Sequence, residues 1–307
     1  MNAVAIEVEA PVAVRGYRRL ALHRLLRQPV TLGALSLLLA LAVLAGLASV
    51  FAPHGWNSID LSAQWRNHGP TLSWHHLLGT DNIGRDVLGR TTWGLRYTLQ
   101  TALVGGLGAT VVALAVGAVA GFRGGWWDAS LMRVADLVTG FPVIVTLIAA
   151  FVWLRPITVW KATLVFVVAM WPFAARTLRA RTASLAAEEF VQAARALGAS
   201  DTRILFRHLL PNAAGTVIVA ATSLVGQIVL IETTAEFFGF GVVSSTRPTL
   251  GNLIAESVSG GLAATNGLGL GWWTWATPMA ALVLLLMAVN LIGDGLDTAL
   301  NPRSSRA

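Results

Sequence analysis

A polar stretch of this chain reads Glu188-Glu189-Phe190-Val191-Gln192-Ala193-Ala194-Arg195-Ala196-Leu197-Gly198, and His208-Leu209-Leu210-Pro211 follows it closely. The stretch lies between hydrophobic runs that are long enough to cross a bilayer, for which a helix needs roughly 20 apolar residues. Charged side chains are costly within the hydrocarbon, so the stretch must lie outside the lipid. The pattern predicts a membrane protein with a long polar loop between two spans.

Composition places the whole chain in the membrane class. Hydrophobic residues make up 55% of its 307 positions, charged residues only 12%, and the mean hydropathy is +0.66. Such a chain is too apolar for a soluble protein. Strand-like alternation is absent, so helices are expected to span the lipid. We predict an all-α polytopic membrane protein with about six transmembrane helices, in the windows Val30–Phe51, Leu99–Gly121, Val134–Trp153, Ile157–Ala175, Ala213–Ile231 and Ala276–Ile292.

The net charge of +7 is explained by membrane topology. Basic residues cluster at 15–27, 123–133, 176–207 and 303–306, which six spans place on one side. Cytoplasmic loops carry an excess of Lys and Arg, so this side is predicted to be cytoplasmic, with both termini on it. Nucleic-acid binding is therefore not expected. The first hydrophobic run is longer than that of a signal peptide, and we interpret it as a retained anchor.

These expectations divide the chain into five parts: a basic cytoplasmic tail (1–29), a first transmembrane helix (30–51), an extracytoplasmic segment (52–97), a five-helix core (98–298) and a cytoplasmic C-terminal tail (299–307). The core includes a cytoplasmic loop at 176–212. The glycines of the second span are predicted to serve close helix packing. Asp128 is expected to cap the helix that follows the turn at Gly124 and Gly125. The chain has no cysteine, which excludes disulfides and thiolate metal sites.

Within the loop, the spacing predicts two short helices. Ser184 is expected to cap the first, with Glu188 and Glu189 in its opening turns, where acidic side chains suit the helix dipole. Gly198 is expected to end this helix, because glycine adopts the left-handed conformation without strain. Ser200 is a candidate cap for the second helix, and Asp201 is the alternative.

The first loop helix carries an apolar stripe, since Phe190, Ala193, Ala194 and Leu197 fall at positions i, i+3, i+4 and i+7. Such a stripe between charges fits a helix that is laid in the groove of a partner protein. It equally fits an amphipathic helix resting on lipid headgroups. The physical pattern alone leaves both interpretations open.

The spacing of the loop resembles the EAA loop of ABC importer permeases, whose pattern is Glu-Ala-Ala, three residues, Gly, nine residues and Ile-x-Leu-Pro. Gln192-Ala193-Ala194 precede Gly198 at that spacing, and His208-Leu209-Leu210-Pro211 complete it. Gln192 replaces the leading acid and His208 replaces the isoleucine. Residues 207–212 (Arg-His-Leu-Leu-Pro-Asn) resemble the peptide/nickel branch of the family.

Four further matches resemble the second, C-type permease subunit of that branch, in the expected order along the chain. They are His76–Asp86, Gly121–Asp128, Glu232–Gly241, and Asn290–Asp294 with Asn301-Pro302-Arg303. Two positions depart from the family pattern: Glu236 replaces a serine, and Leu250 replaces a tryptophan. Both are expected on the outer side, where the solute arrives, so they leave the solute open.

The resemblance implies a type I ABC importer permease in a bacterial plasma (inner) membrane. Its implied partners are a homologous second permease subunit, two P-loop ATPase subunits or domains, an extracytoplasmic solute-binding protein and the lipid bilayer. No Gly-x-x-x-x-Gly-Lys-Ser/Thr motif occurs in the chain, so ATP and Mg are expected on the partner ATPases. We predict no enzymatic activity, no catalytic residue and no bound cofactor for the chain itself.

Three groups of site residues follow from the resemblance and the residue chemistry. The residues expected to couple to the ATPase, as a rigid lever over 184–211, are Glu188, Glu189, Gln192, Ala193, Ala194, Arg195, Gly198, Arg203, Arg207 and Pro211. Those expected at the translocation path, or in an ion pair with the partner subunit, are Glu232 and Glu236. Those expected to contact the binding protein are Gly79, Thr80, Asp81, Arg85 and Asp86. No metal site is predicted in this last segment, because an internal ion pair through Arg85 explains its charges more simply.

Short peptides are the expected cargo, and nickel chelates, glutathione and opine-like solutes are the alternatives within the same architecture. An ion-coupled secondary transporter would need titratable residues near the middle of the bilayer. The middles of the predicted spans contain none. An intramembrane hydrolase is disfavoured for a similar reason, because no histidine lies inside a predicted span.

Overall fold

The structure is a computed structural model, and it describes residue 25 and residues 27–52, 55–60, 68–71, 76–241, 247–264 and 271–300. The expectations for most of the N-terminal tail and for Asn301-Pro302-Arg303 fall on residues outside these ranges. The chain is all-helical, with elements α2 Pro29–Gly46, α3 Ala48–Phe51, α4 Val87–Arg123, α5 Gly125–Thr139, α6 Val143–Trp153, α7 Val159–Ala186, α8 Glu189–Ala196, α9 Asp201–Ile204, a π-helical turn η2 Leu205–Leu209, α10 Leu210–Phe237, α11 Leu250–Ala264 and α12 Trp272–Leu300.

Five of the described helical segments are long and apolar enough to cross a membrane: α2, α4, α7, α9–α10 and α12. These match five of the six predicted windows. Two of the helices run farther than their windows, since α4 begins at Val87 within the predicted outer segment and α7 continues to Ala186 within the predicted loop, whereas the first window is divided between α2 and α3. A hydrophobic window marks only the part of a helix that can sit in lipid, and the polar ends of these helices extend beyond it.

The third predicted span, Val134–Trp153, is not one straight helix. It is divided between α5 and α6, which meet at a 75° bend, and the two together could form a sixth span. The break falls at Gly140-Phe141-Pro142, where Pro142 has no amide hydrogen for the helical ladder and restricts the residue before it. The expectation of a continuous span was therefore wrong, because the proline at this position breaks the helix.

The long helix α4 forms the centre of the bundle and packs against α2, α3, α5, α7, α10, α11 and α12. Its glycines allow the closest of these approaches. A Cβ added at Gly117 would lie 2.6 Å from the carbonyl oxygen of Ala175 and 3.0 Å from the Cβ of Leu178 on α7. Gly106 meets Val225 of α10 in a similarly close contact. The predicted packing role of the glycines is confirmed.

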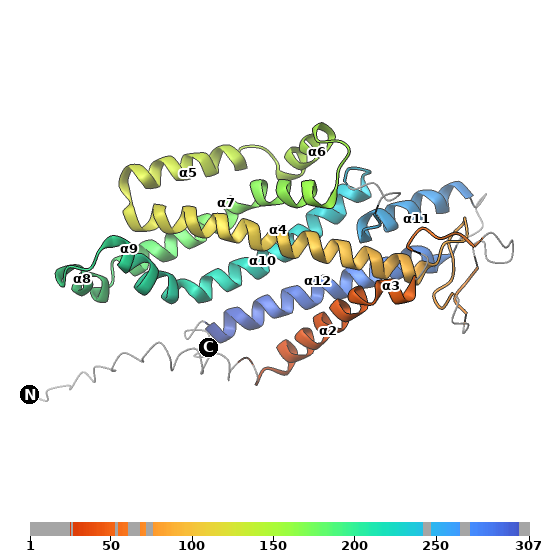
Figure 1. Cartoon of the computed structure of the whole chain (residues 1–307), viewed down its shortest axis with the longest axis horizontal. Helices are drawn as coiled ribbons and strands as arrows, with labels where there is room; N and C mark the ends of the chain where they lie inside the picture. The colour runs from red at the N-terminus through yellow and green to blue at the C-terminus, as the bar shows by residue number, and fades with distance from the viewer. Residues whose placement is uncertain are drawn as a thin grey trace, which may run out of the picture.

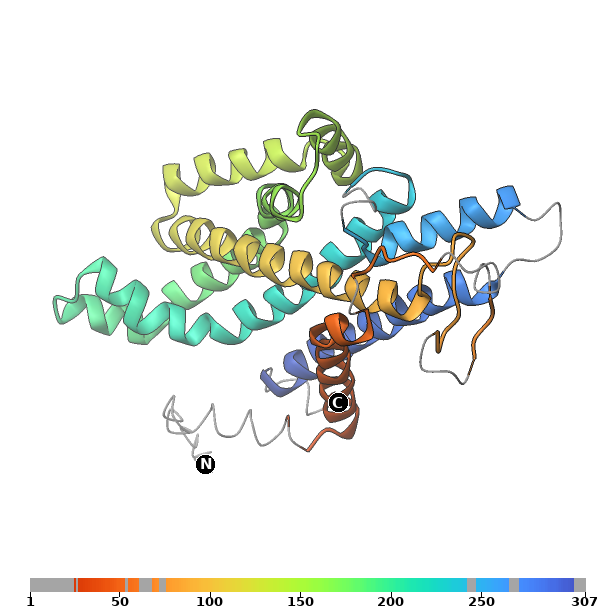
Figure 2. The same cartoon turned by 45° about the vertical axis from the view of Figure 1, so that its right-hand side comes forward.

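The short helices of the polar loop and the segment around residues 76–86 lie at opposite ends of the elongated molecule (Figure 1). One end carries α8 and α9, the two short helices of the polar loop, and we call it the loop end. The other end carries α3, the described residues around 76–86, and α11. The same arrangement is visible after a 45° rotation (Figure 2). The two predicted functional regions therefore lie at opposite ends of the bundle. We call the end that carries α3, residues 76–86 and α11 the outer end.

Candidate functional site

The polar loop folds around a small hydrophobic core of its own. Val191 of α8, Ile204 of α9 and Leu209 of η2 are fully buried, and they cluster with Leu185 and Ala213 from the flanking long helices. Buried apolar contacts between all parts of the loop hold it in one conformation. This core supports the predicted rigidity of the loop, and Val191, which was not among the predicted residues, lies within it.

Glycine and serine shape the loop as expected, whereas the first cap was assigned wrongly. Gly198 has a φ of +79°, and the hydroxyl of Ser200 accepts a hydrogen bond from the amide of Arg203 at 3.4 Å. Ser184 does not cap α8, because α7 continues past it; Glu188 holds the N-cap position, and its side chain makes no capping hydrogen bond. The long helix thus reaches the loop itself before the chain turns.

The predicted apolar stripe is mostly uncovered. Phe190, Ala193 and Leu197 are exposed, with Leu197 at 88%, and only Ala194 packs against the loop core. An apolar side chain so far out of its own fold is poorly solvated, and it gains by burial against a second surface. Leu197 is therefore the most prominent apolar feature of the loop, although it was not among the predicted coupling residues.

Some polar side chains of the loop contact other parts of the chain, and the others face solvent. The guanidinium of Arg195 lies 5.4 Å from the ring centroid of Phe122, at the end of α4. The side-chain amide of Gln192 donates a hydrogen bond to the carbonyl of Ala187 at 3.2 Å. Arg203 and Arg207 are exposed, as are Glu188 and Glu189. Arg195 thus helps to fasten α8 to α4, while the other charges face solvent.

The π-helical turn η2 has a physical cause at Pro211, in the first turn of α10. Proline has no amide hydrogen, so the carbonyl four residues earlier loses its usual helical partner and the ladder widens locally. The side-chain amide of Asn212 donates to the carbonyl of His208 at 2.7 Å. This turn joins the loop directly to the long helix α10.

An ion pair joins α5 to α7, the helix that leads into the loop. Asp128, in the first turn of α5, forms a two-point ion pair with Arg179 of α7. The expectation that Asp128 caps α5 was wrong, because Gly124 holds the cap position and the carboxylate turns to Arg179 instead. Arg179 lies about two turns before the end of α7, so this contact braces α5 against the helix that leads into the loop.

At the outer end, the predicted segment Gly79–Asp86 forms a charged network. The Asp81 carboxylate accepts hydrogen bonds from Arg85 Nε at 2.6 Å and from Arg90 at 3.3 Å, and both arginines also reach Glu256 of α11. The backbone amide of Arg85 donates to Asp81 as well, at 2.9 Å. The predicted internal ion pair is confirmed. It connects the outer segment to α4 and α11.

Other contacts fix the same segment. Asp86 caps α4 by accepting from the amide of Gly89 at 2.6 Å, and its second oxygen lies 2.9 Å from His76 Nδ1. Thr80 is fully buried, and its carbonyl accepts from the indole of Trp273 at 3.1 Å. Gly79 has a φ of +79°, and a Cβ there would lie 2.8 Å from the indole nitrogen of Trp273. These predicted contact residues are therefore largely engaged within the chain.

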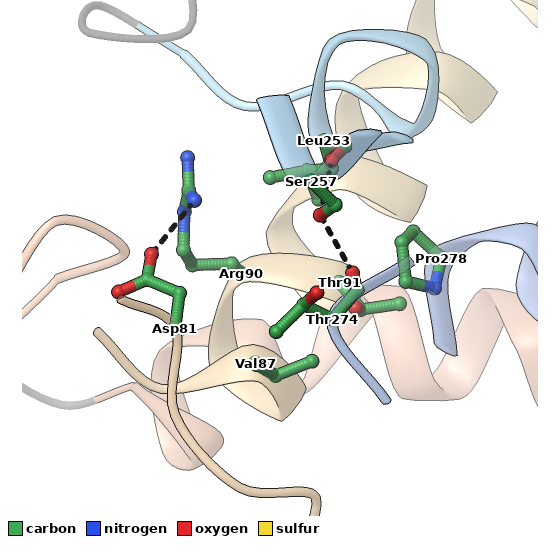
Figure 3. Close-up of a pocket in the computed structure, with 8 residues that line it drawn as sticks. All are labelled: Asp81, Val87, Arg90, Thr91, Leu253, Ser257, Thr274 and Pro278. Carbon is green, nitrogen blue, oxygen red and sulfur yellow. Dashed lines mark hydrogen bonds and ion pairs between the residues drawn. The ribbon is translucent and has the colours of Figure 1, made fainter. Parts of the chain in front are cut away.

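A small pocket of about 20 Å³, room for roughly one water molecule, lies beside this network (Figure 3). Arg90 and Thr91 of α4, Ser257 of α11 and Thr274 of α12 contribute to its lining. In Figure 3 the Ser257 hydroxyl points toward the Thr274 carbonyl, to which it donates at 2.9 Å. The pocket is too small for a transported solute, so it marks a joint between helices.

The two acidic residues predicted at the path are buried inside the chain. Glu232 is 1% exposed, and among the described residues neither of its carboxylate oxygens has a hydrogen-bond partner. Glu236, one turn later, accepts from the hydroxyl of Thr249 at 2.5 Å. Gly251 allows this contact, since a Cβ there would lie 2.8 Å from a Glu236 oxygen. Their role at the path or with a partner subunit stays a prediction.

Comparison with known proteins gives a consistent picture. The family model described as "Binding-protein-dependent transport system inner membrane component" matches residues 113–306. The chain is 36% identical over 258 residues to a Brucella suis protein with a provisional peptide-permease name, covering 83% of this chain and 81% of that protein. It is 34% identical over 292 residues to the oligopeptide transport system permease protein OppC of Mycobacterium tuberculosis, covering 94% of this chain and 95% of OppC.

Among solved structures, a chain of the inward-facing MetNI methionine ABC transporter matches with a TM-score of 0.55 at 22% identity. The match covers 69% of this chain and 96% of that chain. At this level of identity the likeness concerns the fold. The predicted all-helical permease architecture is confirmed, and the predicted likeness to a C-type permease agrees with the similarity to OppC.

Proposed function

Because this chain belongs to the family of binding-protein-dependent transport system inner membrane components, we propose that it forms half of the translocation pathway of an ATP-driven peptide importer. Membership makes it a multi-pass inner membrane permease of an ABC transporter. The proposal adds the cargo, the subunit arrangement and the residues that couple to ATP hydrolysis. A homologous second permease completes the pathway, and two P-loop ATPase subunits bind ATP and Mg beneath it.

The exposed stripe on α8 carries this proposal. Phe190, Ala193 and Leu197 project from a loop whose own core is filled by Val191 and Ile204. A rigid support with an uncovered apolar ridge suits insertion into a groove of a partner protein. Because α8 contacts α4 through Arg195 and packs through Val191 on α9 and η2, which continue directly into α10, a displacement of the ridge is expected to reach the bundle. We therefore assign ATPase coupling to residues 184–211.

The placement of the helix ends supports a cytoplasmic position for this loop. In Figure 1 the start of α2 and the end of α12 both point toward the loop end of the molecule. Basic residues of the long helices and the loop also gather there, which favours the cytoplasmic side. They are Arg123, Arg176, Arg179, Arg195, Arg203 and Arg207. Both termini are accordingly assigned to the cytoplasm, and Gly79–Asp86 to the face that receives the binding protein.

Peptides are the proposed cargo because relatives that this chain matches over most of their length carry peptide names. OppC, which this chain matches along nearly its full length, is named for oligopeptide transport. The chain itself contributes helices that line the path, and the binding protein selects among solutes. Nickel chelates, glutathione and opine-like solutes are the alternative cargoes for the same architecture.

The coupling assignment is tested by Leu197→Ala in the reconstituted transporter, with affinity for the ATPase subunits as the readout. Burial of a leucine side chain contributes about 2 kcal/mol. Its truncation should therefore weaken ATPase binding roughly 30-fold. Leu137→Ala is the matched control, because Leu137 is 70% exposed on α5, away from the loop. Equal affinity for the Leu197 variant and the control would contradict docking at α8.

A further inference from the structure

One face of α4 near the outer end carries a cluster of aromatic and cationic side chains. Trp93, Arg96 and Tyr97 fall at positions i, i+3 and i+4, so they share that face. The rings of Trp93 and Tyr97 stack with centroids 5.7 Å apart, and the guanidinium of Arg96 lies 5.1 Å from the Trp93 ring centroid. The cluster thus begins as a cation held against an aromatic pair.

A second cation reaches the same pair from another element. Arg247, just before α11, places its guanidinium 5.1 Å from the ring centroid of Tyr97. Arg96 and Arg247 are both exposed, whereas Tyr97 is buried. The aromatic pair therefore restrains two arginines that come from separate segments, and their donor groups remain accessible. We call Trp93, Arg96, Tyr97 and Arg247 the arginine–aromatic cluster.

Neither arginine of this cluster has a carboxylate partner within 4.0 Å among the described residues. The contrast with nearby positions on the same end is sharp, since Arg85 and Arg90 both pair with Asp81 and Glu256. Two restrained, accessible guanidinium groups on one aromatic pair, without a counter-charge, are suited to binding an anion. Guanidinium binds carboxylate especially well, because two parallel N–H donors match its two oxygens.

The position of the cluster indicates which anion arrives there. α4 packs against seven helices of its own subunit, yet the face below Arg96 is exposed and apolar, with Leu103, Leu107 and Val111 along it. A central helix with one open face is arranged to meet a second subunit or to line a path between subunits. The cluster lies at the outer end of this face, where cargo would enter from the binding protein.

From this juxtaposition we propose that Arg96 and Arg247 bind the terminal carboxylate of the peptide cargo at the outer mouth of the pathway. The inference rests on the proposed peptide function and adds the group of the cargo that is recognised. The stacked rings of Trp93 and Tyr97 hold the guanidinium groups in place and offer an apolar wall to the adjoining peptide residue. No bond is made or broken, and the carboxylate is held by charge-assisted hydrogen bonds alone.

The test uses the complete transporter in liposomes with saturating binding protein that is preloaded with trialanine or with trialanine amide. Preloading removes the selectivity of the binding protein from the comparison. In the unchanged transporter, trialanine should be taken up faster than trialanine amide. The double variant Arg96→Gln, Arg247→Gln should lower this ratio of uptake rates about tenfold, since a hydrogen bond to a charged group contributes about 1.5 kcal/mol or more. Arg96→Lys with native Arg247 should retain part of the preference.

Arg123→Gln serves as the matched control, because Arg123 makes a similar contact with Trp127, 5.0 Å from the ring centroid, at the loop end of α4. Its preference for trialanine should equal that of the unchanged protein. The site is refuted if the double variant slows both peptides equally, or if its defect follows the content of anionic lipid, which would assign the arginines to headgroup phosphate. An unchanged transporter that moves neither peptide contradicts the peptide function itself, and the carboxylate site with it.

Discussion

The loop end and the outer end of the molecule use their polar residues in opposite ways. At the outer end, Asp81, Arg85, Arg90 and Glu256 pair with one another and connect three segments of the chain. At the loop end, the buried contacts are apolar, and most of the charged residues and the Leu197 side chain face outward. The outer network thus builds structure, whereas the loop presents a surface supported by its own core.

This difference separates two kinds of predicted site residue. A contact with a binding protein was predicted for Asp81, Arg85 and Asp86, but the side chain of each forms hydrogen bonds or ion pairs within this chain. A binding protein that docks there would therefore contact the folded surface that these ion pairs hold in place, and not three free charges. At the loop end, the exposed stripe is free to meet a partner. The following substitutions test that contrast, beginning with the largest expected effect.

Asp81→Ala should destabilise the fold by about 3 kcal/mol, because it leaves the buried Arg90 with one carboxylate partner fewer and frees the backbone around Arg85. Thermal unfolding of the purified protein in detergent measures the loss. Asp136→Ala is the control, since it removes an exposed pair with Arg176 and should cost no more than about 1 kcal/mol. If the two variants unfold at the same temperature, the outer network is not a structural element.

Ile204→Ala should weaken the loop core without touching its exposed stripe. Removal of a fully buried isoleucine side chain costs at least about 2 kcal/mol. ATP hydrolysis stimulated by the loaded binding protein should fall several-fold, whereas basal hydrolysis should be retained. Ile218→Ala, at an exposed position on α10, provides the comparison. Full stimulation in the Ile204 variant would show that coupling does not need a rigid loop.

Gly198→Val should impair coupling through backbone strain. The residue has a φ of +79°, which costs a side-chain-bearing residue roughly 1–2 kcal/mol, and no atom would obstruct the added Cβ. Transport should fall about tenfold while membrane insertion is unaffected. Gly33→Val is matched to it, because its added side chain also meets open space but in an ordinary helix. Normal transport by the Gly198 variant argues against the coupling role of this turn.

The sequence predicted the fold well wherever one helix crosses the lipid alone, because hydrophobic length is a strong signal for such spans. It failed at Val134–Trp153, where Pro142 divides a run of suitable length and composition. Gly198 and Ser200 were predicted correctly, since local backbone conformation determines both. Ser184 was misassigned because nothing local reveals that α7 continues to Ala186.

The candidate sites were predictable to the extent that they depend on spacing along the chain. The stripe of α8 followed from helical periodicity, but the burial of Val191 depends on α9 and η2 packing against it. An internal ion pair through Arg85 was predicted, and Asp81, four residues earlier, forms it, whereas Glu256 joins the pair from 171 residues away. The same holds for Arg247 and Tyr97, whose contact only the folded chain reveals.

Site-directed cross-linking tests the docking claim most directly, because the chain contains no cysteine and a single one can be introduced cleanly. Leu197→Cys, combined with a cysteine in the surface groove of the ATPase, should give a cross-linked permease–ATPase product on oxidation. Ile83→Cys, exposed at the outer end, should give none. Absence of the product from position 197 in a complex that still hydrolyses ATP and transports peptide would contradict the assignment of α8 as the ATPase contact.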